Sequence, residues 1–246
     1  MSRPRVAIVI PARYNSTRLP GKPLLDIVGK PMIQRVYEIA QHVSSVDTIV
    51  VATDDARIRD AVLAFGGNAI LTSTLHQNGT ERTAELARHV VADLYVNIQG
   101  DEPLARHQDI ELLINALLED HTTEIATLSH EIDSQEASNP NSVKVVSSTD
   151  GHAIYFSRAK IPYATLESHP IYHKHIGVYA YRRDALLAYT NYPIGPLEQL
   201  EKLEQLRFLN AGLMIKVLPV APTGPGVDTP QCLQRVRSII EEHNGL

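Results

Sequence analysis

The chain has 246 residues, of which 43% are hydrophobic and 21% are charged, and its formal net charge is −5 at pH 7. This composition is typical of a soluble globular protein, and it excludes a disordered chain or one that binds nucleic acid through a general basic stripe. The single cysteine, Cys232, cannot form an internal disulfide, and no apolar run approaches the roughly 20 residues of a membrane span, so we expect a structural cysteine and a cytoplasmic protein.

Apolar runs alternate with helical patterns through the first hundred residues. The first run, Arg5 to Ile10, is continuous, rich in β-branched residues and ended by Pro11, which is typical of a buried parallel strand. Strands are expected at 5–10, 47–53, 69–72 and 94–99, and helices at 32–42 and 56–65, with residues 76–82 leading into a further helix that runs through about 91. This alternation predicts βαβ units in a three-layer α/β/α fold with a mainly parallel sheet.

The second half is less regular. Helices are expected at 109–118, 197–209 and 229–243, and strands at 124–129, 142–147, 153–156, 175–181 and 214–220. Asp150-Gly151 predicts a turn between two of these strands, and residues 161–172, with two prolines, are interpreted as an exposed arm. Since no linker or repeat divides the chain, we predict a single domain over 1–246 with an inserted hairpin and arm around 142–175.

Three cations and no acid lie in the loop from Pro11 to Pro23, namely Arg13, Arg18 and Lys22. Arginine and a glycine-flanked lysine suit phosphate oxygens, so the loop could hold a polyanion. A solvated basic loop is the alternative. The position after a strand favours the first interpretation, because open α/β sheets bind ligands where loops leave the carboxyl ends of strands. Pro23 follows Lys22 where a Walker A motif needs Ser or Thr, which disfavours a P-loop NTPase.

Two aspartates lie in turns that could face the same cleft. Asp101 follows the strand at 94–99, within Gln99-Gly-Asp-Glu-Pro, and Asp228 precedes the last helix, within Gly-Val-Asp-Thr-Pro. Helix capping is the alternative for both segments, and it is strong for Asp228. Mg²⁺ prefers one or two carboxylates together with substrate oxygens, so the pair predicts a magnesium site.

Long motifs in a fixed order make the chain resemble the 3-deoxy-D-manno-octulosonate (Kdo) cytidylyltransferases, also called CMP-Kdo synthetases. The resemblance covers nearly the whole chain. Its motifs are Ile10-Pro-Ala-Arg-Tyr-Asn-Ser-Thr-Arg-Leu-Pro-Gly-Lys-Pro-Leu, Val51-Ala-Thr-Asp, Gly79-Thr-Glu-Arg, Val96-Asn-Ile-Gln-Gly-Asp-Glu-Pro, Asn139-Pro-Asn-Ser-Val-Lys-Val-Val, Tyr155-Phe-Ser-Arg-Ala, His175-Ile-Gly-Val-Tyr-Ala-Tyr-Arg, Leu203-Glu-Gln-Leu-Arg and Gly226-Val-Asp-Thr-Pro.

The resemblance implies a Rossmann-like nucleotidyltransferase that transfers CMP from CTP to the anomeric 2-hydroxyl of Kdo, releases pyrophosphate and supplies lipopolysaccharide synthesis. It also implies Mg²⁺ held by Asp101 and Asp228, CTP and Kdo as small-molecule substrates, no nucleic-acid or membrane partner, and a homodimer. Lys22, Arg13 and the two aspartates are expected to be catalytic. The residues expected around the nucleotide are Pro11, Ala12, Arg13, Arg18, Lys22, Gly79 and Arg82, and those expected around the sugar are Gln99, Arg158, His175, Tyr179 and Glu204.

Other interpretations stay open. A sibling enzyme could use sialic acid or an 8-amino analogue of Kdo, and a catalytically silent nucleotide-binding protein could share the fold. Tyr179 could be a core residue and Glu204 a solvated one. Asn15 and Pro225 depart from the family pattern and could change loop rigidity, and the arm is short where the family forms its dimer.

Overall fold

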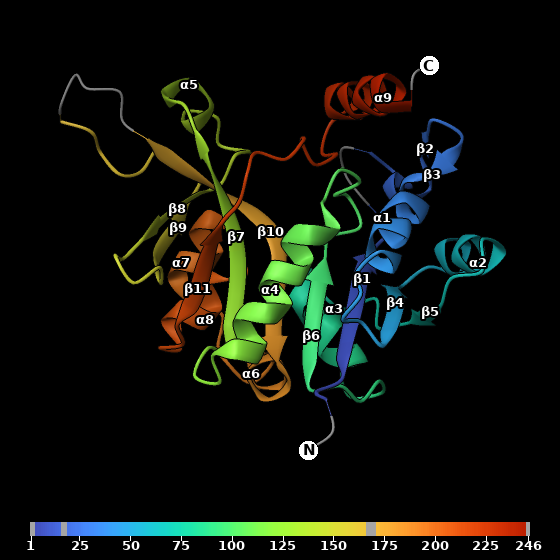
Figure 1. The fold of residues 1–246 in the computed structure, drawn as a ribbon, viewed down its shortest axis with the longest axis horizontal. Helices are drawn as coiled ribbons and strands as arrows, with labels where there is room; N and C mark the ends of the chain where they lie inside the picture. The colour runs from blue at the N-terminus through green and yellow to red at the C-terminus, as the bar shows by residue number, and fades with distance from the viewer. Residues whose placement is uncertain (1–2, 16–18, 166–170, 245–246) are drawn as a thin grey trace.

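A nine-stranded sheet forms the centre of the computed structural model, which describes residues 3–15, 19–165 and 171–244 (Figure 1). Its main path has the order β11-β7-β10-β6-β1-β4-β5. The bounds are β1 Val6–Ala12, β4 Thr48–Thr53, β5 Ala69–Leu71, β6 Leu94–Ile98, β7 Ile125–Ile132, β10 Tyr172–Arg182 and β11 Ile215–Pro219. On this path β10 runs antiparallel to both neighbours and the other described strands run parallel, so the predicted mainly parallel sheet is confirmed.

Helices cover both faces because the central strands are apolar on both sides. All seven residues of β1 are buried; Ile8 and Ile10 point into one core cluster, and Ala7 and Val9 into the other. The first cluster is covered by α1 (Met32–Gln41), α2 (Ala56–Ala64) and α4 (His107–Glu119), and the second by α3 (Gly79–Leu86), α6 (Arg183–Tyr189) and α8 (Leu206–Asn210). The three-layer α/β/α architecture is therefore confirmed.

The predicted hairpin is present as β8 (Lys144–Ser147) and β9 (Ala153–Ser157), which pair antiparallel and join the sheet through β10. The end of the expected arm is strand instead, because β10 already begins at Tyr172, and a short helix, α5 (Ser134–Ala137), precedes the hairpin. The sheet takes strands from both halves of the chain, and the single domain stays a prediction.

The prediction of one continuous helix at 197–209 is wrong. It is divided into α7 (Pro196–Glu201) and α8, because Lys202 adopts a left-handed conformation with φ of 55° and ends the first helix. A continuous α-helix cannot pass through such a residue. The break turns the chain before Glu204, one of the predicted sugar-binding residues.

A third, smaller cluster joins the end of the chain to its beginning. The helix α9 (Pro230–Asn244) packs through Leu233, Val236 and Ile240 against Ile27 and Met32. Ile27 belongs to the small hairpin of β2 (Asp26–Ile27) and β3 (Lys30–Pro31), which follows the short 3₁₀ helix η1 (Lys22–Leu24). The segment between β11 and α9 crosses the upper end of the sheet in Figure 1.

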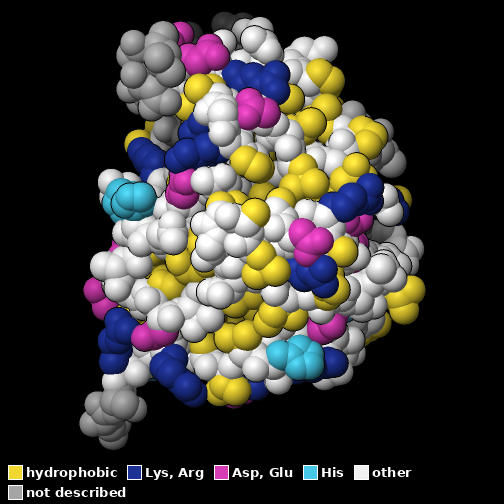
Figure 2. Space-filling model, turned by 90° about the vertical axis from the view of Figure 1, so that its right-hand side faces the viewer, with side chains coloured by type: hydrophobic (Ala, Val, Ile, Leu, Met, Phe, Trp, Pro, Cys, Tyr) yellow, Lys and Arg dark blue, Asp and Glu magenta, His cyan; other side chains and the backbone are white. Residues whose placement is uncertain are grey.

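Charges of both signs are mixed over the face shown in Figure 2, where Lys and Arg side chains lie among Asp and Glu without forming a continuous stripe. Among the helices of the described ranges, none is long and apolar enough to cross a membrane.

Candidate active site

The candidate site lies where β1 and β6 end. The chain passes from β1 outward to β4 and β5 and then returns to the other side of β1 as β6, which makes this strand pair a topological switch point. Such a point leaves a crevice between the loops that follow the two strands. Gly100 N donates to Pro11 O at 3.3 Å, and a Cβ on Gly100 would lie 3.0 Å from that oxygen. The predicted basic loop and the Gln99-Gly-Asp turn therefore leave the sheet side by side.

Lys22 is the point where the two predicted aspartates meet. Its Nζ donates to Asp101 Oδ2 in a short contact and lies 3.4 Å from Asp228 Oδ1. Asp228 is held there because Val227 N donates to Asp101 O at 2.8 Å. The Lys22 side chain is only 14% exposed. Asp101 and Asp228 come 79 and 206 positions after Lys22 in the sequence, and the fold brings all three side chains into one charged cluster.

A third carboxyl group, that of Glu102, lies near this cluster. Burial, reinforced by Asp101 and Asp228, raises the pKa of Glu102 to about 8. Within the described part of the chain, no group of three or more His, Cys, Asp or Glu side chains forms a ready metal cage. Two carboxylates on one cleft wall nevertheless fit Mg²⁺, which takes its remaining ligands from water and phosphate oxygens. The donor set fits magnesium bound with substrate, and Asp101 and Asp228 would hold it.

The basic loop is braced from α2. The Arg57 guanidinium lies 3.4 Å from the centroid of the Tyr14 ring, while it also bonds the Asp55 carboxylate. Gly21 packs on the same ring, donates from its N to Tyr14 O at 3.0 Å, and has φ of 66°, a conformation that favours glycine. Lys22 follows at once, so this contact helps to set its position. Sequence reasoning missed both Tyr14 and Arg57.

Of the remaining predicted nucleotide residues, Pro11, Ala12 and Gly79 lie along the same edge. Arg13 is exposed, and Arg18 lies outside the described residues. Gly79 begins α3 close to Gln99 and Pro11, because a Cβ there would be 2.8 Å from Gln99 Nε2 and 3.2 Å from Pro11 Cγ. Pro11 and Ala12 are buried at the end of β1, so they can offer backbone groups only. A shared nucleotide pocket at these residues stays a prediction.

Arg82 has structural partners that the sequence did not predict. Its guanidinium donates to Asp54 Oδ2 at 3.0 Å, to Ser73 O at 3.3 Å and to the Thr72 hydroxyl. The side chain is 4% exposed and joins the loops that follow β4 and β5 to α3. Arg82 therefore links these two loops to α3, and its predicted role at the nucleotide stays a prediction.

Four of the five predicted sugar residues gather on the face of the sheet covered by α3. The His175 and Tyr179 rings are 5.3 Å apart, and Tyr179 lies opposite Asn97, which accepts from Gln99 Nε2 at 3.2 Å. Asn97 Nδ2 is a buried polar atom without a partner among the described residues, and the buried Tyr179 Oη has only a weak interaction with the Thr127 side chain. Asn97 was missed, although a polar residue in the apolar run Leu94–Ile98 is a signal that could have found it.

Glu204 lies between α7 and α8, and its carboxylate reaches the start of α3. There it accepts from Thr80 Oγ1 at 3.1 Å and from Thr80 N at 3.4 Å. Burial raises its pKa to about 7, so the carboxyl changes charge close to neutral pH. Since Thr80 follows Gly79, which lies against Gln99, the Glu204 carboxylate belongs to the same cleft. The alternative of a solvated Glu204 is therefore wrong.

Arg158 is held differently from the other four. Its Nε donates to Glu201 O at 2.8 Å and its Nη1 to Pro140 O at 3.0 Å. The carbonyl of Arg158 accepts from Lys144, a fully buried lysine whose Nζ also donates to Asn139 O and Ser142 O. Two of the N–H groups of the guanidinium thus bond backbone carbonyls, and the predicted role of Arg158 at a sugar carboxylate stays a prediction.

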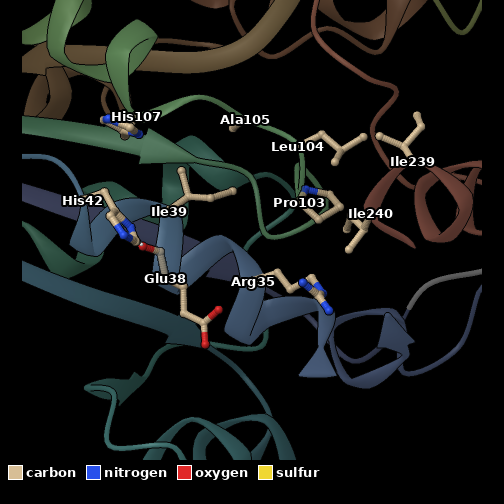
Figure 3. Close-up of a pocket in the computed structure, with 10 residues that line it drawn as sticks. All are labelled: Arg35, Glu38, Ile39, His42, Pro103, Leu104, Ala105, His107, Ile239 and Ile240. Carbon is tan, nitrogen blue, oxygen red and sulfur yellow. Dashed lines mark hydrogen bonds between the residues drawn. The ribbon is translucent and has the colours of Figure 1, made fainter. Parts of the chain in front are cut away.

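A separate, open cavity of about 460 Å³ lies beside Pro103 and Leu104 (Figure 3). It is lined by residues of α1, of the loop that leads into α4, and of the second half of α9. Its lining residues are Arg35, Glu38, Ile39, His42, Pro103, Leu104, Ala105, His107, Ile239 and Ile240. None of the predicted site residues lines it, so the cavity belongs to the packing of α9 and not to the cleft.

Comparisons with known proteins show which proteins the chain is similar to. Residues 7–216 match the family model described as Cytidylyltransferase. The chain is 53% identical over 238 residues to the 3-deoxy-manno-octulosonate cytidylyltransferase of Escherichia coli, with 97% of each chain covered, and 47% identical over 238 residues to the enzyme of the same name from Fusobacterium nucleatum subsp. nucleatum, with 96% of this chain and 97% of the relative covered. A solved structure of a CMP:2-keto-3-deoxy-manno-octonic acid synthetase complexed with CTP is 53% identical, has a TM-score of 0.94, and is matched over 97% of this chain and 99% of its own.

Proposed function

The chain belongs to the 3-deoxy-manno-octulosonate cytidylyltransferases, and from this premise we propose that its cleft transfers CMP from CTP to the 2-hydroxyl of Kdo and releases pyrophosphate. One observation supports the proposal above the others. Lys22 meets both Asp101 and Asp228 at the switch point between β1 and β6, in a chain that is related over nearly its whole length to these enzymes. This arrangement suits phosphoryl transfer, which depends mainly on positioning and on charge.

On the nucleotide side, Lys22 and Arg13 offset the negative charge that develops as pyrophosphate departs, with Arg18 as a third cation from the same loop. The braced Tyr14 ring keeps Lys22 at the end of β1. Mg²⁺, when held by Asp101 and Asp228, supplies positive charge to the phosphate oxygens. Dependence on Mg²⁺ is part of the proposal.

On the sugar side, polar groups of different kinds orient Kdo. Gln99 offers an amide that is already fixed by Asn97, and His175, Tyr179 and Glu204 offer hydrogen-bonding groups to hydroxyls. Because the surrounding wall is buried, a sugar without the matching hydroxyls would leave these groups unpaired, which is costly. This cost is the physical basis for selecting Kdo over sialic acid.

The experiment that tests the function is pyrophosphate release from CTP in the presence and absence of Kdo. We expect release that requires both substrates and that falls when UTP or ATP replaces CTP. Sialic acid and the 8-amino analogue, supplied separately, should give a lower kcat/KM than Kdo. A higher value for either would change the assigned sugar, and no release with any of the three would leave the alternative of a silent nucleotide-binding protein.

A homodimer is also part of the proposal. Large apolar side chains are exposed on the arm, the hairpin and α7, among them Tyr163 at 87%, Ile154 at 61% and Leu200 at 80%. Exposed apolar groups of this size commonly mark an interface. Sedimentation at micromolar concentration should give about twice 27.2 kDa, and a species of 27.2 kDa alone would contradict the dimer. A cytoplasmic location stays a prediction.

A further inference from the structure

The pairing of β10 with β7 is interrupted beside the sugar side of the cleft. Ile176 pairs with Leu128, but the next pair along the strands is Tyr179 with Thr127. Gly177 and Val178 of β10 therefore have no pairing partner on β7. The Thr127 side chain, fully buried, occupies this irregularity. Its Oγ1 lies 2.9 Å from Val178 O, 3.2 Å from Ile176 O and 3.1 Å from His175 Nε2.

The Thr127 hydroxyl donates its hydrogen bond to a backbone carbonyl. A hydroxyl has a single proton and two lone pairs, whereas a backbone carbonyl can only accept. Because two carbonyls lie within reach, the proton goes to one of them, and Val178 O is the nearer. The lone pairs of Thr127 Oγ1 are then left for His175 Nε2 and for the Tyr179 hydroxyl, which also interacts with the Thr127 side chain. The contact with His175 is a hydrogen bond only if His175 Nε2 carries a proton and donates it.

The His175 ring is neutral at physiological pH. Burial without a compensating acid lowers its pKa to about 3, and the edge of Phe156 and the ring of Tyr179 pack around it at centroid distances of 5.0 and 5.3 Å. A neutral imidazole carries one N–H, and the other nitrogen has a lone pair. Through the described ranges, Thr127 is the single polar partner found for this ring.

We propose that Thr127 is a positioning residue that fixes His175 in the Nε2–H tautomer and thereby makes His175 Nδ1 a hydrogen-bond acceptor on the sugar side of the cleft. The group bound there is then a donor, a hydroxyl or an ammonium, and never a carboxylate, whose lone pairs would oppose that of Nδ1. The carboxylate of a 2-keto acid sugar must bind elsewhere. The identity of the sugar rests on the proposed function, whereas the tautomer does not.

Three variants separate this role from a general effect on folding. Thr127→Val keeps the shape of the side chain and removes the hydroxyl, and Thr127→Ser restores the hydroxyl. Thr123→Val is the matched control, because Thr123 is also buried on the chain leading into β7 and its hydroxyl bonds Asp120, far from His175. A melting temperature for each variant shows how much stability is lost in each case.

The first readout is the imidazole ¹⁵N spectrum of the ¹⁵N-histidine-labelled protein at pH 7.5 without ligand. We expect the Nε2–H pattern for His175 in the wild type, in Thr127→Ser and in Thr123→Val, and a mixture of tautomers in Thr127→Val. An Nδ1–H pattern or a charged ring in the wild type would overturn the proposal, as would an unchanged Nε2–H pattern in Thr127→Val. If Thr127→Val does not fold, the spectra of the wild type and Thr127→Ser decide.

The second readout is steady-state kinetics with CTP and Kdo. Loss of one buried hydrogen bond should raise the KM for Kdo about tenfold in Thr127→Val, with recovery in Thr127→Ser and little change in the KM for CTP. Equal increases for both substrates would point to a structural role and contradict the proposal. If the wild type has no activity with Kdo but His175 has the Nε2–H pattern, the proposed function fails while the tautomer assignment stands.

Discussion

Replacement of Lys22 by methionine tests the centre of the proposed mechanism. The substitution keeps a flexible side chain of similar length and removes the positive charge that meets Asp101 and Asp228. At the 3.4 Å between Lys22 Nζ and Asp228 Oδ1, two unit charges interact by about 5 kcal/mol at an effective dielectric constant of about 20. A phosphate oxygen that replaces one carboxylate in this contact would gain an interaction of the same order.

We expect the loss in catalysis to be smaller than this interaction energy, because Arg13 and Arg18 supply further positive charge and water can enter the altered site. Removal of one preorganised donor to developing negative charge typically costs about 10²–10³ in kcat. For Lys22→Met we therefore predict a loss of about 10²–10³ in kcat and a higher KM for CTP. The assay is pyrophosphate release at saturating Kdo with CTP varied.

Lys30→Met is the matched control. Lys30 also lies in a Gly-Lys-Pro sequence, but it is on β3, its side chain is 43% exposed, and it pairs with Glu38 at 2.8 Å. An exposed ion pair of this kind contributes about 0–1 kcal/mol, so activity should change little. If the two variants lose activity equally, the loop acts only through bulk charge, and a loss below about threefold in Lys22→Met would refute the assigned role.

Three further predictions concern the rest of the cleft. Asp101→Asn or Asp228→Asn should each lower turnover by several powers of ten, because a weaker metal ligand stabilises the transferring phosphoryl group less; near-normal turnover at limiting Mg²⁺ would disprove the metal site. Gly79→Ala should push the Gln99 amide, 2.8 Å from the new Cβ, away from Asn97 and raise the KM for Kdo about tenfold without unfolding the protein; an unchanged KM would exclude Gln99 from the sugar site. The pKa of Glu204 is raised from 4.5 to about 7, so its contribution to stability is complete below about pH 4.5 and is lost as pH rises through 7. The melting temperature of Glu204→Gln minus that of the wild type should therefore be several degrees higher at pH 8 than at pH 4.5. The same difference at both pH values would contradict the raised pKa.

The sequence by itself determined the frame of this protein and the edge of the sheet where its site lies. Continuous apolar runs at 5–10 and 94–99 specify strands buried on both faces, because each run must satisfy its backbone within a sheet and its side chains in two cores. The loop after the first strand and the turn after the fourth then meet at one edge by geometry alone. Asp101 and Lys22 could be placed there in advance for this reason, and the motifs also indicated the family.

The tertiary structure decided which side chains have partners. The hydroxyl of Thr127 reaches His175 across an irregularity in β10, and the guanidinium of Arg158 is occupied by Glu201 O and Pro140 O. The left-handed conformation at Lys202, which divides the predicted helix, also depends on its surroundings. Periodicity records the pattern of burial along the chain, whereas these contacts join residues 18 to 48 positions apart or depend on a register shift. No local pattern of residues encodes such a contact, so it exists only once the strands and helices have packed.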